Sequence, residues 1–177
     1  MVFVSSSMIY GDYVDGTKEN ADTKPTNLYA EAKITAERFV KHYHNHFGVD
    51  YAIVRPSGVY GPGDMDDRVL SKFFIQAMKN ETIEVHDGNN KVDFTYVDDI
   101  VTGVVAAHDN APSTDPGPAH RVYNIGNHQS EPLMRMISVL EDCLGKKAET
   151  IMKPMQMGDV KESFADIEAI RRDLGFE

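Results

Sequence analysis

The sequence predicts an α/β protein with a largely parallel β-sheet. Short apolar segments alternate along the chain with longer segments whose apolar residues recur at helical spacing, and turn-forming residues separate them. Strands that alternate with helices in this way usually form a parallel sheet, and ligands bind beyond the carboxyl ends of such strands. Polar residues follow two predicted strands, at 5–7 and 55–61, so we expect these segments to form walls of a binding site.

The amino-terminal part contains two predicted strands on either side of a long helix. Residues 2–4 are apolar and precede a run of serines, which predicts a buried strand that ends in a polar loop. Residues 27–47 have helical periodicity and are followed by Gly48, a residue type that commonly ends helices. Residues 51–54 form the next apolar segment, and the Arg55-Pro56 pair is predicted to end that strand.

The rest of the chain continues the alternation. Acidic side chains at 98–99 begin one predicted helix, because negative charge is favourable at a helix amino terminus, and Gly145 ends another. Residues 109–120 contain three prolines and one glycine and are predicted to form a surface loop. The predicted helices of this part are 69–79, 98–108 and 134–144, and the predicted strands are 83–85, 94–97 and 122–125.

Composition and charge limit the class of protein. The 177 residues include 18 lysines and arginines against 28 acidic residues, and the net charge of −10 argues against nucleic acids and membranes as partners. Cys143 is the only cysteine, which excludes an internal disulfide and fits a reducing compartment. No apolar run approaches the roughly 18 residues of a membrane span, so we predict a cytoplasmic location. No metal site is predicted, because His42 and His46 lie on a charged helix without a nearby carboxylate.

Tyr29 and Lys33 form the pattern Y-x-x-x-K near the start of the predicted long helix. A spacing of four places both side chains on one helical face, where they can contact the same ligand. A free tyrosine has a pKa of about 10, so a tyrosine base at neutral pH needs a cation that favours the phenolate. A lysine one turn away supplies that charge, and a serine at the end of the adjacent strand could hold the substrate oxygen. In isolation the pattern is better explained by a solvated lysine beside an amphipathic tyrosine, so the functional interpretation depends on its context.

That context is an ordered series of motifs: SSSMIYG, YAEAK, RPSGVYGPG, DFTYVDDI and YNIGN. In this order the sequence resembles the NAD-dependent epimerases and dehydratases of the extended short-chain dehydrogenase/reductase family, which act on nucleotide sugars. The later segment PMQMGDV, followed by an alanine-aspartate pair and LGF, resembles the UDP-glucuronate 4-epimerase branch. The resemblance implies the C-terminal part of a Rossmann-like parallel-sheet fold plus a small α/β substrate-binding lobe. Residues 1–62 would belong to the NAD-binding part and 63–177 mostly to the lobe, with a strand and helix near 94–125 returning to the sheet.

The resemblance also implies a catalytic set of Ser6, Tyr29 and Lys33. Tyr29 would take the proton from a sugar hydroxyl as hydride passes to NAD, and the hydride would return to the other face of the keto sugar. Lys33 would hold the nicotinamide ribose, and Ser5 and Pro56 would contact the cofactor as well. Family members commonly dimerise through the helix that carries the tyrosine, so a homodimer is a further implication.

The substrate contacts implied by the resemblance are Ser7, Gly58, Arg68, Val85 and Asp159. The family often has asparagine at the position of Gly58 and arginine at that of Val92, and both of those residues bind the substrate diphosphate. Neither glycine nor valine can donate a hydrogen bond from a side chain. Lys91 or Arg68 could compensate with a point charge.

Other activities stay open at this point. The stretch KVDFTYV also resembles the 3β-hydroxysteroid dehydrogenase branch, which oxidises an apolar alcohol that has no diphosphate. A sugar dehydrogenase or dehydratase of the same family is another alternative, although a dehydratase usually has an acid/base carboxylate pair after the catalytic serine, and SSSMIYG has none. The alternative from a different class is a non-catalytic remnant, which would fail to bind NAD.

The sequence lacks the glycine-rich turn that receives the pyrophosphate in a dinucleotide-binding fold. The Gly61-Pro62-Gly63 segment is no substitute, because it lies in another context and acidic residues follow it. We therefore expect this chain to correspond to the carboxyl-terminal part of a longer enzyme, without the adenine and pyrophosphate half of the cofactor site.

Overall fold

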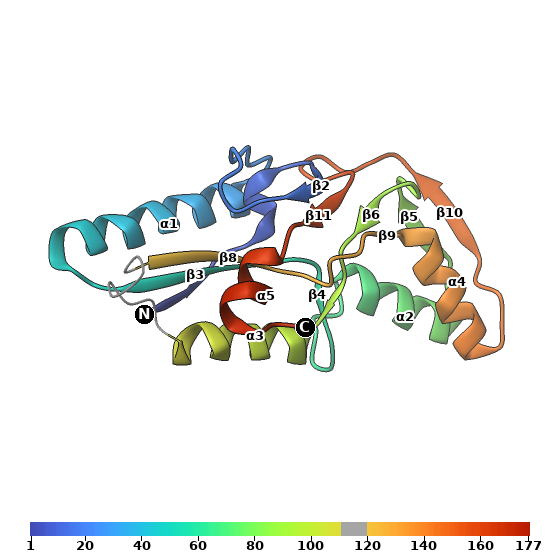
Figure 1. Cartoon of the computed structure of the whole chain (residues 1–177). Helices are drawn as coiled ribbons and strands as arrows, with labels where there is room; N and C mark the ends of the chain where they lie inside the picture. The colour runs from blue at the N-terminus through green and yellow to red at the C-terminus, as the bar shows by residue number, and fades with distance from the viewer. Residues whose placement is uncertain (111–119) are drawn as a thin grey trace.

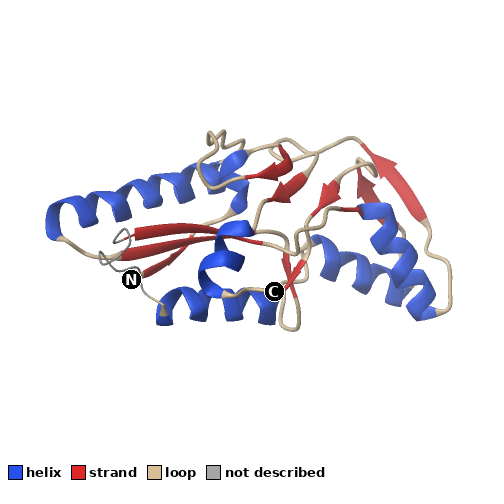
Figure 2. Ribbon diagram, viewed as in Figure 1, coloured by secondary structure: helices blue, strands red, loops and turns tan. Residues whose placement is uncertain are grey.

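A computed structural model describes residues 1–110 and 120–177 and shows helices layered on a parallel sheet (Figure 1; Figure 2). The central sheet consists of β1 (Val2–Val4), β3 (Tyr51–Pro56) and β8 (His120–Ile125), in the order β1-β3-β8. Both strand pairs are parallel. The three carboxyl ends therefore lie at one edge of the sheet, and the predicted α/β class with parallel strands is confirmed.

Helices cover both faces of this sheet. Helix α1 (Leu28–Phe47) lies on one face, and α3 (Val97–Asp109) and α5 (Glu168–Leu174) lie on the other (Figure 1). The first five residues of β3 are buried, as expected for a strand covered on both faces. The core between the sheet and helices α3 and α5 consists of Ala52, Val54, Ile100, Ala107, Tyr123, Ile125, Ile167, Ile170 and Phe176.

The ends of α1 follow from its sequence. Asn27 has an extended backbone and its side chain accepts a hydrogen bond from the backbone N–H of Ala30, which satisfies a donor that the first turn leaves unpaired. Gly48 ends the helix in the left-handed conformation, with φ +65°. The predicted helix is confirmed, and it begins one residue later than expected because Asn27 is its cap.

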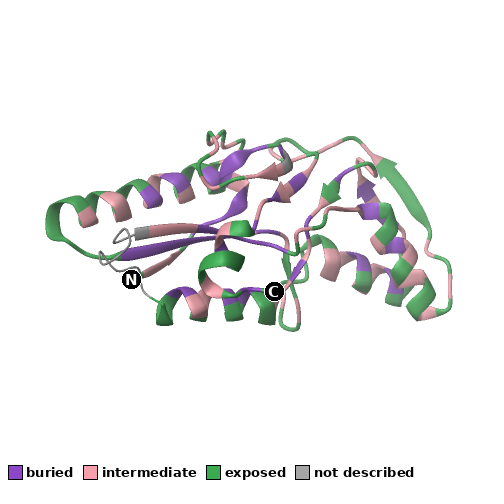
Figure 3. Cartoon of the chain, viewed as in Figure 1, coloured by how far each residue is buried: buried purple, intermediate pink, exposed green. Residues whose placement is uncertain are grey.

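A second group of elements packs around its own core. Helices α2 (Val69–Lys79) and α4 (Leu133–Leu144) lie against the parallel pair β5 (Ile83–His86) and β10 (Thr150–Lys153). The core that they share consists of Phe73, Ala77, Ile83, Val85 and Ile137. Figure 3 shows buried residues inside this group and along β3, whereas the outer face of α1 is exposed. The division of the chain at residue 62 stays a prediction.

Short elements connect the two groups. The 3₁₀ helix η1 (Ser7–Tyr10) follows β1, and β2 (Tyr13–Thr17) pairs in parallel with β11 (Ser163–Ala165). Strand β4 (Val59–Tyr60) pairs with β7 (Thr95–Tyr96), and β6 (Lys91–Val92) pairs with β9 (Glu131–Pro132). These pairs join segments far apart in the sequence.

Some expectations need correction. Strand β1 is not buried, because it pairs only with β3 among the described residues and Val4 is 44% exposed. The strand expected at 94–97 is limited to Thr95–Tyr96, since Val97 already begins α3. Strands β2, β10 and β11 and helix α5 were not predicted. Most of the loop expected at 109–120 lies outside the described residues.

None of the helices in the described part of the chain is long and apolar enough to cross a membrane. The described residues also contain no group of three or more His, Cys, Asp or Glu side chains that could hold a metal ion. The cytoplasmic location and the exclusion of nucleic acids stay predictions.

Candidate active site

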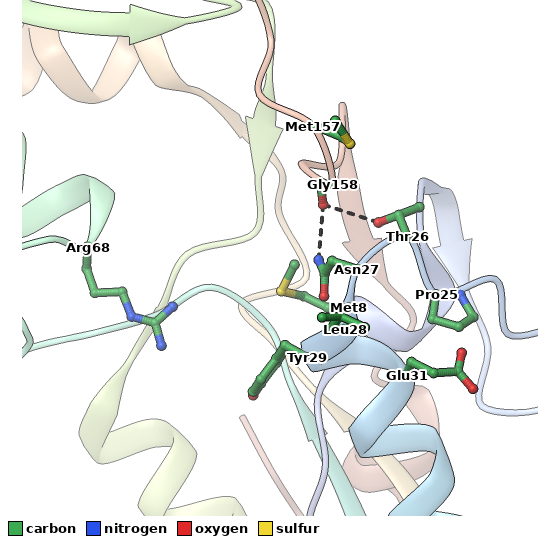
Figure 4. Close-up of a pocket in the computed structure, with 10 residues that line it drawn as sticks. All are labelled: Met8, Pro25, Thr26, Asn27, Leu28, Tyr29, Glu31, Arg68, Met157 and Gly158. Atoms are coloured by element: carbon green, nitrogen blue, oxygen red, sulfur yellow. Dashed lines mark hydrogen bonds between the residues drawn. The ribbon is translucent and has the colours of Figure 1, made fainter.

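A cleft of about 860 Å³ opens beside the amino terminus of α1 (Figure 4). It brings together η1, the first turn of α1, the amino terminus of α2 and the loop between β10 and β11. Tyr29 and Arg68 are the predicted site residues among those that line it. The complete lining is Met8, Pro25, Thr26, Asn27, Leu28, Tyr29, Glu31, Arg68, Met157 and Gly158.

Tyr29 and Lys33 lie close together on one face of α1, as their spacing predicts. The Lys33 ammonium lies 5.6 Å from the centroid of the Tyr29 ring, and its Nζ donates to the carbonyl oxygen of Val4 at 3.0 Å. This bond ties α1 to the carboxyl end of β1 and fixes the position of the charge. Tyr29 is 51% exposed, so its phenol faces the cleft beside a held positive charge.

The serines after β1 are buried and differ in their partners. Ser6 is the amino-terminal cap of η1, and its Oγ accepts from the backbone N–H of Met8 at 3.2 Å. Ser7 Oγ accepts a hydrogen bond from the Tyr13 hydroxyl at 2.6 Å. Ser5 Oγ has no hydrogen-bond partner among the described residues. Ser6 does not itself line the cleft, but Met8, two residues later, does. Ser7 accepts this bond, so its own hydroxyl hydrogen could still donate to a substrate.

The segment that follows β3 has a backbone conformation that requires glycine. Pro56 is the last residue of β3, and Gly58 has φ +28°. A Cβ atom at Gly58 would overlap the carbonyl oxygen of Asp93. The asparagine that the family often has at this position therefore cannot be accommodated without a shift of the backbone.

Arg68 places a positive charge on the far side of the cleft. It is the capping residue of α2 and has an extended backbone, and in Figure 4 its guanidinium points across the cleft toward Tyr29. Neither Lys91 nor Val92 lines the cleft. Of the two cations that could compensate for the missing diphosphate contacts, Arg68 is therefore the one that faces this site.

The loop that carries Gly158 closes one end of the cleft, and sequence reasoning missed its contact with α1. The Thr26 hydroxyl and the Asn27 amide both donate to the carbonyl oxygen of Gly158, at 3.2 and 3.1 Å (Figure 4). Gly158 has φ +88°, and a Cβ there would lie 3.2 Å from the Asn27 Cβ. The segment PMQMGDV was the only signal in the sequence that could have suggested this loop.

The remaining predicted substrate residues lie at different depths. Val85 is completely buried in the core between α2, α4 and β5, so its side chain does not reach the cleft. Asp159 directly follows Gly158 in an exposed turn, where its backbone N–H donates to Gln156. Asp159 does not itself line the cleft but follows Gly158, which does, and the roles of Val85 and Asp159 stay predictions.

Two buried ionisable groups lie behind the serines and Gly58. Burial raises the pKa of Tyr13, and hydrogen bonds with Ser57 and Ser7 oppose this effect only in part. Burial also raises the pKa of Asp93 to about 6, and the backbone N–H of Asn127, which donates to its Oδ1 at 2.8 Å, acts in the opposite direction. Tyr13 therefore stays protonated at neutral pH and can donate to Ser7.

Known proteins resemble this chain in sequence and in structure. The pattern of the NAD dependent epimerase/dehydratase family matches residues 1–126. UDP-glucuronate 4-epimerase 6 of Arabidopsis thaliana is 33% identical over 191 residues, which cover 100% of this chain and 42% of that protein. Protein CapI of Staphylococcus aureus is 32% identical, with 100% of this chain and 58% of that protein covered.

A solved structure of an epimerase also resembles this chain. UDP-glucuronic acid 4-epimerase from Bacillus cereus, in complex with UDP-glucuronic acid and NAD, superposes with a TM-score of 0.91 at 29% identity. The match covers 99% of this chain and 55% of that chain, so the present chain spans about half the length of its relatives. The family match extends over most of the sequence, and the fold is that of Rossmann-like epimerases. The chain belongs to the NAD-dependent epimerase/dehydratase family.

Proposed function

We propose that this chain carries the catalytic set of an NAD-dependent epimerase that acts on a nucleotide sugar of the UDP-glucuronate or UDP-galactose type. The observation that carries the proposal is the pair formed by Tyr29 and Lys33. The phenol is exposed in a cleft, and the ammonium is held 5.6 Å from the ring centroid by its bond to Val4. The two side chains therefore share one face of α1 at the cleft, where both can contact the same substrate and cofactor.

The chemical roles follow from this geometry. Tyr29 takes the proton from a sugar hydroxyl, and Lys33 places a positive charge beside the tyrosine ring. Ser6, at the start of η1, holds the substrate oxygen by donating a hydrogen bond from its hydroxyl, which now accepts from Met8. The proton returns from Tyr29 when the sugar hydroxyl is restored, so the base is regenerated in each cycle.

The residues present fit the nicotinamide end of NAD. Ser5 Oγ is buried and without a hydrogen-bond partner among the described residues, and a buried polar atom of this kind favours a polar ligand. Lys33 uses one of its N–H donors on Val4 and has others free for ribose hydroxyls. Pro56 lies at the carboxyl end of β3, next to the same edge of the sheet. NAD, when bound, supplies the hydride acceptor and donor for the reaction.

Arg68 is the proposed contact for the substrate diphosphate. Gly58 has no side chain to donate, and Val92 is apolar, so the positive charge must come from another part of the site. The guanidinium of Arg68 points into the cleft opposite Tyr29 (Figure 4). Arginine binds phosphate oxygens through two parallel N–H donors, which suits a diphosphate. The UDP-glucuronic acid bound by the Bacillus cereus relative supports a sugar of this class.

NAD binding and turnover test the proposal. NAD is titrated into the 177-residue protein by calorimetry, and the protein is then assayed with UDP-glucuronate and with UDP-galactose. We expect conversion to the 4-epimer without accumulation of NADH, because the hydride returns to the sugar. Steady accumulation of NADH would indicate a dehydrogenase instead, and failure to bind NAD would indicate a non-catalytic chain.

The variant Tyr29→Phe tests the base. Loss of the hydroxyl should lower kcat by about 1000-fold, which is typical of the removal of a general base. Tyr43→Phe is the matched control, because Tyr43 is a similarly exposed tyrosine on the same helix and lies outside the cleft. Full activity of the Tyr29 variant would refute the catalytic assignment.

A further inference from the structure

Arg55 lies in a buried network that joins the two segments carrying the proposed catalytic set. The guanidinium is 3% exposed and contacts α1 through one side of its fork and η1 through the other. Helix α1 carries Tyr29 and Lys33, and Ser6 caps the amino terminus of η1. The Arg55 side chain therefore contacts both α1 and η1, the two segments that carry the proposed catalytic residues.

The contact with α1 is a bidentate ion pair with Glu37. Arg55 Nε donates to Glu37 Oε1 at 2.9 Å and Nη2 donates to Oε2 at 2.7 Å. The Glu37 side chain is completely buried. Glu37 follows Lys33 by one helical turn, as Lys33 follows Tyr29. Two parallel hydrogen bonds fix orientation as well as distance, so the pair sets the rotation of α1 about its own axis.

The contact with η1 is made through Tyr10. Arg55 Nη1 donates to the Tyr10 hydroxyl at 2.6 Å and to the backbone carbonyl of Glu19 at 2.9 Å. The Tyr10 hydroxyl in turn donates to Asn124 Oδ1 at 2.8 Å. Burial raises the pKa of Tyr10 to about 12, so this hydroxyl keeps its proton. Tyr10 is the last residue of η1, and Ser6 caps the other end of the same turn.

The network is anchored in the sheet by Asn124 of β8. Its backbone N–H donates to Glu19 Oε1 at 2.9 Å, and its side-chain amide donates to the carbonyl oxygens of Thr17 and Asp166. Every link is therefore a hydrogen bond between residues at least 18 positions apart in the sequence. None of these residues lines the cleft. Their effect on the reaction must pass through the segments that they hold.

We propose that Arg55 and Glu37 are positioning residues, which set the placement of Ser6 relative to Tyr29 and Lys33. The proposal rests on the proposed function for its catalytic consequence. A buried ion pair is weak support for stability alone, since apolar residues of similar volume often replace such a pair without loss. The relative placement of α1 and η1 does depend on the ion pair, because apolar side chains cannot reproduce the hydrogen bonds by which the Arg55 guanidinium connects these two segments.

Three variants separate placement from stability. The double variant Glu37→Leu with Arg55→Met removes both charges and keeps most of the volume. Arg55→Lys keeps the charge but loses the bidentate fork. Tyr10→Phe keeps the ion pair with Glu37 but removes the hydroxyl that bonds η1 to Arg55 and to Asn124. Tyr123→Phe is its matched control, because the Tyr123 hydroxyl bonds to Asp173 on the other face of the sheet.

The primary measurement is amide hydrogen exchange, which does not require activity. We expect exchange in residues 5–10 and 28–34 to accelerate by about tenfold or more in all three variants, while residues 69–86 and 133–144 keep the wild-type rate. Tyr123→Phe should leave residues 5–10 and 28–34 unchanged. Unchanged exchange there in Arg55→Lys and Tyr10→Phe would overturn the proposal. These two single variants decide the matter if the double variant does not fold.

The second measurement is turnover per folded molecule. If the wild-type chain is active, Arg55→Lys and Tyr10→Phe should lower kcat by about 100-fold with a smaller change in KM, as a misplaced catalytic group does. A loss of melting temperature with normal kcat would mean that the network only stabilises the fold, and would refute the proposal. An inactive wild-type chain that binds no NAD would refute the proposed function, and hydrogen exchange alone would then test the placement.

Discussion

Asp93 is a buried carboxyl group whose ionisation should make the stability of this chain depend on pH. Its side chain is completely buried, and Oδ1 accepts from the backbone N–H of Asn127 while Oδ2 has no partner among the described residues. Burial raises its pKa from 3.8 to about 6. The folded state therefore binds this proton more tightly than the unfolded state does.

The sign and size of the effect follow from this difference. A folded pKa above the unfolded pKa gives stabilisation that is complete at low pH and is lost as the pH rises through the folded value. A difference of about two pKa units corresponds to about 3 kcal/mol, since one unit equals about 1.36 kcal/mol. Roughly 1 to 1.5 kcal/mol of this loss should fall between about pH 5 and pH 7, where few other carboxyl groups titrate.

Asp93→Asn isolates this contribution. The amide oxygen can still accept from Asn127, and the amide nitrogen replaces Oδ2, which has no partner among the described residues. The variant should lose the pH dependence over this interval and should be more stable than the wild type at neutral pH by up to about 3 kcal/mol.

Urea unfolding followed by circular dichroism at a series of pH values measures the free energies. Asp22→Asn is the control, because Asp22 is exposed. An Asp93 variant with the same slope against pH as the wild type would refute the reasoning.

Two glycines give further predictions. Gly158→Ala should destabilise the chain by about 1 kcal/mol more than Gly63→Ala, in addition to the cost of positive φ that both share, because only the Gly158 Cβ would press against Asn27, at 3.2 Å. Thermal unfolding compares the two variants, and equal losses would contradict the packing argument. Gly58→Asn should cost about 3 kcal/mol, because its Cβ would overlap the Asp93 carbonyl oxygen. Urea unfolding measures this, and a variant as stable as the wild type would show that the segment can move.

Local signals in the sequence predicted most helices well. Helix α2 has the predicted bounds at both ends, and α1 differs by one residue because the Asn27 side chain caps it. These features depend on residues a few positions apart, so that periodicity and capping residues are sufficient to find them. The pair of Tyr29 and Lys33 was predictable for the same reason, since a helix fixes the relation between positions four apart.

Features that depend on distant partners were not predictable. Strands β2 and β11 are short, and they become strands only by pairing with each other across about 150 residues of chain. An apolar segment such as β1 does not reveal whether it has one neighbour or two, which is why its burial was overestimated. The end of the cleft that Gly158 closes was not predicted for the same reason, because Gly158 and Asn27 meet only in the folded chain.

The bonds from Thr26 and Asn27 to Gly158 have a consequence for synthesis of the protein. They join positions 132 and 131 residues apart, and such contacts form slowly because a long loop must close first. On the ribosome, α1 can form early, but the end of the cleft that Gly158 closes cannot form until residue 158 has left the exit tunnel. Nascent chains stalled before that residue should therefore display the Tyr29 segment to chaperones without being able to retain a ligand there.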